Sequence, residues 1–192
     1  LQVALQACGV GRNDEVLVPS ITYVASYQAI SATGARPVSC DIDLENMQFS
    51  LIDLKKRVSR KTKAIMPVHL TGRMSDMLEI KRIAEKYNLR VVEDCAQAIG
   101  SKLHNQYSGS FGDIGCFSCH PLKNLNACGD GGFLVTEDSD FAKKIREFRN
   151  HGLVNRNLVA NFGTVSRMDE LQAAILNFRL KKLQEVINIR RK

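Results

Sequence analysis

Several features that would assign a function directly are missing from this sequence. No apolar run approaches the roughly 20 residues that a membrane-spanning helix needs, so no membrane segment is expected. The first eight residues lack a basic leader and a small-residue cleavage site, which predicts a cytoplasmic location. Neither GxGxxG nor GxxxxGK(S/T) occurs, which disfavours a plain nucleotide-binding α/β domain.

The six cysteines do not form the pattern of a metal site. Cys116 and Cys119 make one CxxC pair, but a structural zinc site needs a second ligand pair at a suitable spacing, and none is visible. The remaining cysteines are scattered, mostly in apolar runs where cysteine behaves as a small hydrophobe. A thioredoxin-type CxxC opens a helix, whereas this pair lies in a strand-like run. We therefore expect neither a metal nor a redox site.

The formal net charge is +7, with basic clusters at residues 55–57, 60–63 and 190–192. These clusters lack interleaved aromatic residues and any recognisable nucleic-acid module, so solvated helix faces are expected rather than nucleic-acid binding. A general positive field weakly favours an anionic substrate.

Apolar runs alternate with amphipathic stretches along the 192 residues, a length sufficient for one domain with a hydrophobic core. Alternating strands and helices predict an α/β fold with a mostly parallel, mixed sheet covered by helices on both faces. Strands are expected at residues 15–19, 37–42, 64–69, 89–92, 115–118 and 133–136. Helices are expected at 23–33, 51–58 with Ser50 as N-cap, 75–87, 139–150 and 168–183, and residues 107–114 form a turn-rich connection.

Lys123 is the most informative residue because of where it lies. It follows an apolar strand-like run and precedes the glycine-rich segment 129–132. Asp94 ends another apolar run upstream, and ligands of such sheets bind beyond the carboxyl ends of the strands. An amine and a carboxylate placed in this way are the two groups that pyridoxal phosphate requires. The lysine forms a Schiff base with the aldehyde, and the carboxylate keeps the ring nitrogen protonated.

Each residue taken alone also has an ordinary structural interpretation. Most lysines are solvated surface charges, and an aspartate at a strand end often caps a turn or a helix. The pairing of Lys123 with Asp94, their spacing and the flanking motifs favour the cofactor interpretation.

The chain resembles the DegT/DnrJ/EryC1/StrS family of sugar aminotransferases, which are fold-type I pyridoxal-phosphate enzymes. The resemblance covers nearly the whole chain, and eight motifs carry it in order. They are GRNDEV (11–16), PSITYVA (19–25), PVHLTGR (67–73), EDCAQA (93–98), SCHPLKNL (118–125), GDGG (129–132), NHG (150–152) and SRMDELQAA (166–174).

The resemblance implies a role for each of five residues. Lys123 is the catalytic lysine that binds the cofactor and moves the proton, and Asp94 pairs with the pyridinium nitrogen. Gln97 lies near the ring and its phenolic oxygen, Ser118 donates to the phosphate, and Tyr23 stacks on the ring face. Tyr23 could instead be a core aromatic at a helix start, and Ser118 a satisfied strand hydroxyl.

The implied reaction moves an amino group from an amino-acid donor, by resemblance glutamate, to a keto group of a nucleotide-linked sugar. Amino-sugar and polysaccharide biosynthesis use such enzymes, and the family's sites lie at a homodimer interface. The chain is expected to be a large domain, residues 1–192, truncated at both ends and without the C-terminal small domain. It begins after the family's phosphate-binding Gly-Thr pair, and Val165 stands where the family has an Asn that reaches a phosphate across the dimer.

Two other interpretations remain within or beside this family. Dehydratases of the family carry His at the lysine position, so Lys123 argues against that activity. A non-catalytic or regulatory member, or an inactive truncated remnant, is supported by the missing segments and Val165 and opposed by the intact Lys123, Asp94 and Ser118. The sequence does not identify the sugar, the nucleotide or the ring position.

Overall fold

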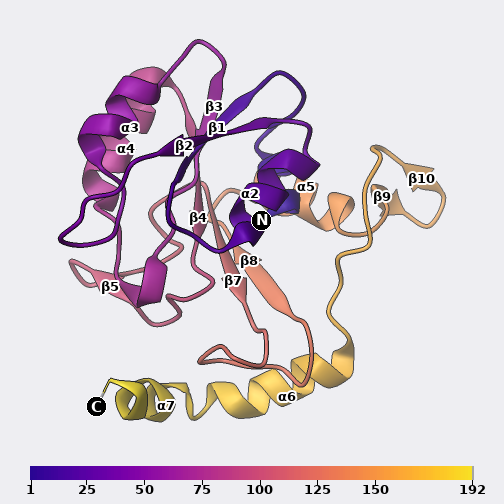
Figure 1. The fold of residues 1–192 in the computed structure, drawn as a ribbon. Coiled ribbons are helices and arrows are strands. Elements are labelled where there is room, and N and C mark those ends of the chain that lie inside the picture. Colours follow the sequence, from indigo (N-terminus) through magenta and orange to yellow (C-terminus); the bar gives the residue numbers. More distant parts are fainter. Residues whose placement is uncertain (192) are drawn as a thin grey trace.

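A six-stranded sheet with the order β2-β1-β3-β4-β7-β8 organises the protein in a computed structural model, which describes residues 1–191 (Figure 1). Five of its strands are parallel, and the last is antiparallel to its neighbour. The predicted fold class is therefore confirmed. The strands are β1 (Glu15–Pro19), β2 (Arg36–Cys40), β3 (Thr62–Ile65), β4 (Arg90–Asp94), β7 (Ile114–Ser118) and the antiparallel β8 (Gly132–Val135).

Helices cover both faces of the sheet because successive strand side chains point to opposite sides. Val16 and Val18 pack with Ile30 in one core cluster, whereas Leu17 packs with Leu54 in another. The first cluster joins the sheet to α1 (Gln2–Ala7), α2 (Val24–Ala32) and α5 (Ser139–Phe148). The second joins it to α3 (Leu51–Arg57) and α4 (Met77–Tyr87).

Most predicted elements lie where the sequence indicates, with shifted ends. The bounds of β1 agree with the prediction, and α3 begins after Ser50, whose Oγ accepts a 3.3 Å hydrogen bond from the Asp53 amide. The strand predicted at 64–69 ends instead at Ile65. Pro67 lacks the N–H that would continue the ladder, and Val68 makes only an isolated bridge to Asp94. A small hairpin, β5 (Lys102–Leu103) with β6 (Gln106–Tyr107), reaches into the predicted turn-rich segment.

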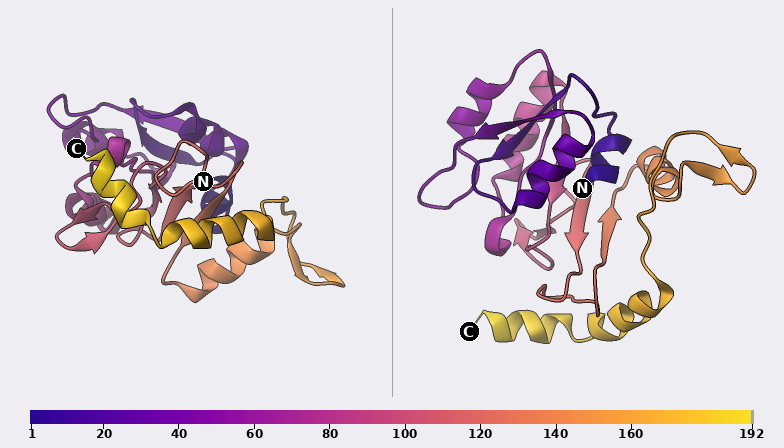
Figure 2. Two further views of the ribbon diagram at one scale, coloured as in Figure 1. Left: turned by 90° about the horizontal axis from the view of Figure 1, so that it is seen from below. Right: turned by 45° about the vertical axis from the view of Figure 1, so that its right-hand side comes forward.

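The helix predicted at 168–183 is present but shorter at both ends. The structure has two helices, α6 (Glu170–Leu180) and α7 (Leu183–Arg190), separated by a turn at Lys181 and Lys182. Both run beneath the carboxyl end of β7 (Figures 1 and 2). On α6, Leu176 is buried, whereas Leu171 and Phe178 are 72% and 66% exposed.

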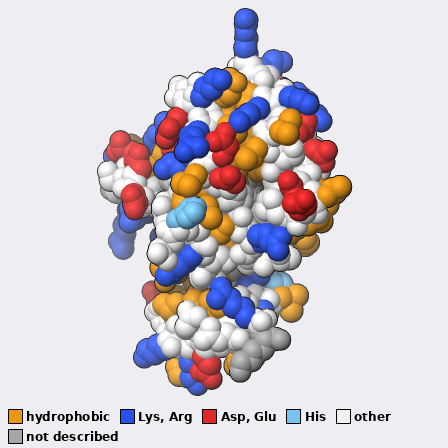
Figure 3. Space-filling model, turned by 90° about the vertical axis from the view of Figure 1, so that its left-hand side faces the viewer, with side chains coloured by type: hydrophobic (Ala, Val, Ile, Leu, Met, Phe, Trp, Pro, Cys, Tyr) orange, Lys and Arg blue, Asp and Glu red, His pale blue; other side chains and the backbone are white. Residues whose placement is uncertain are grey.

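Basic side chains on the α3 and α4 side are dispersed among acidic and apolar ones (Figure 3). Several pair locally: Lys55 and Arg82 both contact Glu79, at 2.7 and 3.3 Å. Lys192, the last residue of the C-terminal basic cluster, lies outside the described residues. Within residues 1–191, no helix combines the length and apolarity needed to cross a membrane. A second hairpin, β9 (Leu153–Asn155) with β10 (Leu158–Val159), precedes α6.

Candidate active site

Asp94 is a buried carboxylate at the carboxyl end of β4. Its residue is only 5% exposed, and its Oδ2 accepts a 2.9 Å hydrogen bond from Ser26 Oγ, while Oδ1 accepts a 3.1 Å bond from the Ala96 amide. No lysine, arginine or histidine among residues 1–191 forms an ion pair with it. Each carboxylate oxygen has two lone-pair directions, so Asp94 can accept further hydrogen bonds. A buried anion without a counter-ion is costly, and a cationic ligand group would relieve that cost.

Lys123 lies in an irregular segment, residues 119–131, that joins β7 to β8. Its amide donates to the His120 carbonyl at 2.8 Å, and its half-buried side chain lines a cavity of about 390 Å³. Gln97 lines the same cavity, together with residues of α7 such as Arg190. Gln97 Oε1 accepts a 2.7 Å bond from the Thr71 amide. The structure thus brings two of the predicted site residues, Lys123 and Gln97, to one cavity.

The other three predicted residues, Asp94, Ser118 and Tyr23, are not among those that line this cavity. Ser118 ends β7, the strand beside β4, where Asp94 pairs with Cys116. Its Oγ accepts a 3.2 Å bond from the His120 amide, so its hydroxyl hydrogen can still be donated. Tyr23 directly precedes α2 and is 72% exposed, which contradicts its interpretation as a core aromatic.

Ser26 was missed as a site residue by the sequence analysis. It lies on α2, 68 residues from Asp94 in sequence, and is itself buried. Thr22 Oγ1 lies 2.8 Å from Ser26 Oγ, so two hydroxyls form a chain that ends on the carboxylate. The only sequence signal is the i, i+4 spacing of two hydroxyl residues at a helix start, which places them on one face.

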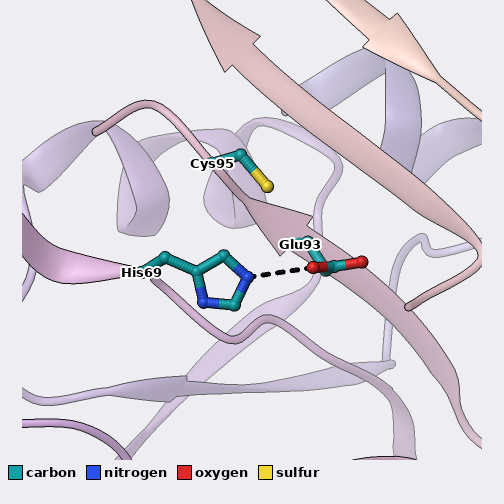
Figure 4. A group of neighbouring side chains, drawn as sticks. All are labelled: His69, Glu93 and Cys95. Carbon is teal, nitrogen blue, oxygen red and sulfur yellow. Dashed lines mark hydrogen bonds and ion pairs between the residues drawn. The ribbon is translucent and has the colours of Figure 1, made fainter. Parts of the chain in front are cut away.

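Glu93, the carboxylate next to Asp94, has a structural role. Both its side chain and that of His69 are fully buried, and His69 Nε2 lies 2.9 Å from Glu93 Oε2 (Figure 4). The amides of Gly109, Phe111 and Gly112 also donate to this carboxylate, at 2.7–2.9 Å. Burial alone would raise the pKa of Glu93, but the hydrogen bonds from His69 and from the Gly112 and Gly109 amides outweigh it and lower that pKa.

His69, Glu93 and Cys95 form the one group of potential metal ligands within residues 1–191, their ligand atoms lying within 4.8 Å of one another (Figure 4). Both nitrogens of His69 are already used, since Nδ1 accepts a 3.2 Å bond from the Ser75 amide. Burial raises the pKa of the Cys95 thiol, which opposes the thiolate form that binds metals. Burial likewise raises the pKa of Cys116, in the CxxC pair, to about 11. The potential metal-binding atoms of His69 and Glu93 are therefore already occupied by hydrogen bonds within the protein.

Replacing Glu93 by glutamine is expected to destabilise the protein by about 2–4 kcal/mol, since one amide oxygen cannot serve four donors. The lowered pKa of Glu93 contributes stability above its unfolded-state pKa, and this contribution is lost as the pH falls through the folded-state pKa. The variant should therefore lose less stability between neutral and acid pH than the parent. Urea unfolding at several pH values measures both effects. Glu85→Gln, at an exposed position of α4, is the control, and equal free energies of unfolding for the two variants would contradict the structural role.

Comparison with known proteins places these observations in a family. The model of the DegT/DnrJ/EryC1/StrS aminotransferase family matches residues 1–192. The chain is 47% identical over 176 residues to a UDP-N-acetyl-3-dehydro-alpha-D-glucosamine 3-aminotransferase of Acidithiobacillus ferrooxidans. That match covers 92% of this chain and 48% of the relative.

Solved structures give the same picture. DesV of S. venezuelae, in complex with a ketimine intermediate, superposes with a TM-score of 0.93 at 40% identity, over 96% of this chain and 50% of that one. NtdA of Bacillus subtilis, with the bound cofactor PMP, superposes with a TM-score of 0.88 at 37% identity, over 95% of this chain and 42% of that one. The chain therefore spans about half the length of the relatives it matches.

Proposed function

Because the chain belongs to the DegT/DnrJ/EryC1/StrS aminotransferase family, we propose that it carries the cofactor site of a pyridoxal-phosphate-dependent sugar aminotransferase. The enzyme would move an amino group from an amino acid, glutamate in our proposal, to a keto group of a nucleotide-linked sugar. The name of the Acidithiobacillus relative supports this reaction class, and the ketimine and PMP in the two solved structures support the cofactor. Since the chain spans about half of those proteins, we propose that it corresponds to most of their large domain, without a C-terminal small domain.

The observation that carries the proposal is the buried Asp94 carboxylate, which has no cationic partner among the described residues. A protonated pyridine nitrogen is a hydrogen-bond donor with positive charge, the kind of group such a carboxylate can accept. Ser26 and the Ala96 amide fix the two oxygens from the protein side, so the carboxylate is oriented before any ligand arrives. When bound, pyridoxal phosphate supplies an electron sink for the carbanion formed at the substrate carbon.

The other proposed site residues each offer a suitable free group. Lys123 presents an amine at the cavity wall, to attach the cofactor aldehyde and, when released, to carry the proton to and from the substrate carbon. Ser118 retains its hydroxyl hydrogen for a phosphate, and the Gln97 amide group is free to donate near the phenolic oxygen. The exposed ring of Tyr23 offers a face on which a planar cation can stack.

We also propose that the full-length protein is a homodimer. Leu171 and Phe178 on α6 leave apolar surface uncovered, which supports a contact between copies. The cytoplasmic location and a role in polysaccharide synthesis stay predictions. The non-catalytic alternative is not favoured, because Lys123, Asp94 and Ser118 are all present and the Acidithiobacillus relative is named as an aminotransferase.

Amine transfer by the full-length protein tests the proposal. We expect glutamate to convert the bound cofactor to its amine form, seen as a loss of visible absorbance with release of 2-oxoglutarate. A keto-sugar nucleotide from a panel of UDP- and dTDP-linked compounds should then restore the absorbance and become aminated. The same protein without the sugar controls for cofactor loss. Tight cofactor binding with no amine transfer from any donor would instead support the non-catalytic interpretation.

A further inference from the structure

The segment that carries Lys123 has little regular structure of its own. Its base is closed by two backbone bonds, from Cys119 N to Gly131 O and from Ala127 N to Cys119 O, each 2.7 Å. Between these ends the chain makes turns rather than a helix or strand. A reacting side chain needs a geometry fixed to a fraction of an ångström, so a segment of this kind needs support from outside.

That support comes from polar side chains of α6 and α7. Gln172 Oε1 accepts from the Cys128 amide at 2.8 Å. Arg179 Nη1 donates to both the backbone oxygen and the Oδ1 of Asn126, at 2.6 and 2.9 Å.

Arg190, on α7, contacts the segment on both sides of Lys123. Its Nη1 donates to Asn124 Oδ1 at 2.8 Å and to the Leu122 carbonyl at 3.4 Å, so its two acceptors flank Lys123. It also lines the cavity that Lys123 lines. The helix residues 172, 179 and 190 thus meet the segment in reverse order, at residues 128, 126 and 122–124. The two helices lie along the segment below β7 (Figure 1).

An apolar cluster lies beneath these hydrogen bonds. Leu125 and Ala127 of the segment pack with Leu176 of α6, and the partly buried Leu183 of α7 packs against them. The apolar contacts hold the helices to the segment, and the directional hydrogen bonds fix its backbone. A planar guanidinium group donates its hydrogen bonds in fixed directions, so its bonds to amide and carbonyl oxygens orient the backbone of the segment.

We propose that Arg179 and Arg190 are positioning residues that hold the segment 119–131 so that the Lys123 amine faces the cavity. This inference rests on the role of Lys123 in the proposed function. Neither arginine is assigned a part in the chemistry; both act through the backbone that carries the lysine.

Hydrogen–deuterium exchange of the cofactor-free, full-length protein tests the hold directly. Arg179→Gln and Arg190→Gln are expected to speed exchange in peptides covering 119–131 by about tenfold, the effect of losing roughly one net hydrogen bond to a charged group. Peptides of β1 and β4 should not change. Lys181→Gln removes the same charge from an exposed neighbouring position and is expected to behave as the parent.

Two functional measurements separate positioning from general stability. The arginine variants should capture pyridoxal phosphate more slowly and show a lower kcat, with a KM for the sugar nucleotide close to that of the parent. Arg179→Lys keeps the positive charge but lacks the planar guanidinium with its several N–H donors. Its kcat should therefore lie between those of Arg179→Gln and the parent. Unchanged exchange and unchanged capture in both glutamine variants would overturn the proposal.

A double-mutant cycle covers the case in which Arg179→Gln unfolds the protein globally. Asn124→Ala removes the short acceptor of Arg190 without touching either helix. If Asn124 acts only through Arg190, the double variant Asn124→Ala/Arg190→Gln should show the same exchange rate in residues 119–131, and the same rate of cofactor capture, as Arg190→Gln alone. Additive effects of the two substitutions would overturn the proposal. The exchange readout needs no cofactor, so it stands even if Lys123 proves not to bind pyridoxal phosphate, which would defeat the proposed function alone.

Discussion

Replacing Lys123 by alanine is expected to abolish amine transfer, with kcat lowered by at least about 10²–10⁴-fold, the range that a positioned general acid–base contributes. The loss should be larger than this minimum because the same amine is proposed to attach the cofactor. Lys123 is the lysine that lines the cavity shared with Gln97, so no other described lysine is placed to replace it there. Steady-state kinetics measure the loss of amine transfer, and the visible absorbance of the bound cofactor measures the loss of its attachment to the protein.

The control for this variant is Lys81→Ala, at an exposed position of α4. It removes the same charge from the chain and should retain the kinetics and the absorbance of the parent. Lys123→Ala should still fold, since the hydrogen bond that Lys123 makes to the His120 carbonyl comes from its backbone amide, which alanine retains. If Lys123→Ala retained the parental kcat, Lys123 would not be the catalytic lysine.

Replacing Asp94 by asparagine should leave the fold nearly intact and lower kcat by about 10²-fold or more. A neutral amide cannot hold the proton on the pyridine nitrogen, so the ring loses its capacity as an electron sink. The fold should survive because the hydroxyls of Ser26 and Thr22 can reverse their donor direction toward an amide. Circular dichroism and urea unfolding check the fold, and steady-state kinetics check the rate.

Asp140→Asn, at an exposed position near the start of α5, controls for the loss of one negative charge. Its kcat should equal that of the parent. If Asp94→Asn retained the parental kcat, Asp94 would be a structural cap whose role ends with its bond to the Ala96 amide.

The sequence predicted the sheet and its covering helices because those depend on local patterns. The apolar run at 15–19 and the Ser50 cap act within a few residues, and both are confirmed. The predicted start of α4 at Ser75 is wrong by two residues, because Asp76 caps this helix and Ser75 Oγ donates to Gln48 instead. The break after Leu180 carries no Gly or Pro, so periodicity alone did not reveal it.

The candidate site was predictable only in part, for a related reason. Lys123 and Asp94 stand out because strand ends can be located from the sequence. The bond from Ser26 to Asp94 spans 68 positions, and that from Arg179 to Asn126 spans 53. Such pairs depend on how helices cross the sheet, which no local pattern encodes. Glu93 shows the converse case, since a second carboxylate at the same strand end proved to be part of the framework.

The residue to which the cofactor attaches in the full-length protein tests the proposed function most directly. Borohydride reduction fixes pyridoxal phosphate to the amine that holds it, and peptide mapping by mass spectrometry then identifies the residue. We expect a single label on Lys123, absent from Lys123→Ala. Label on any other lysine, or no stable label after reduction of the cofactor-loaded protein, would contradict this expectation.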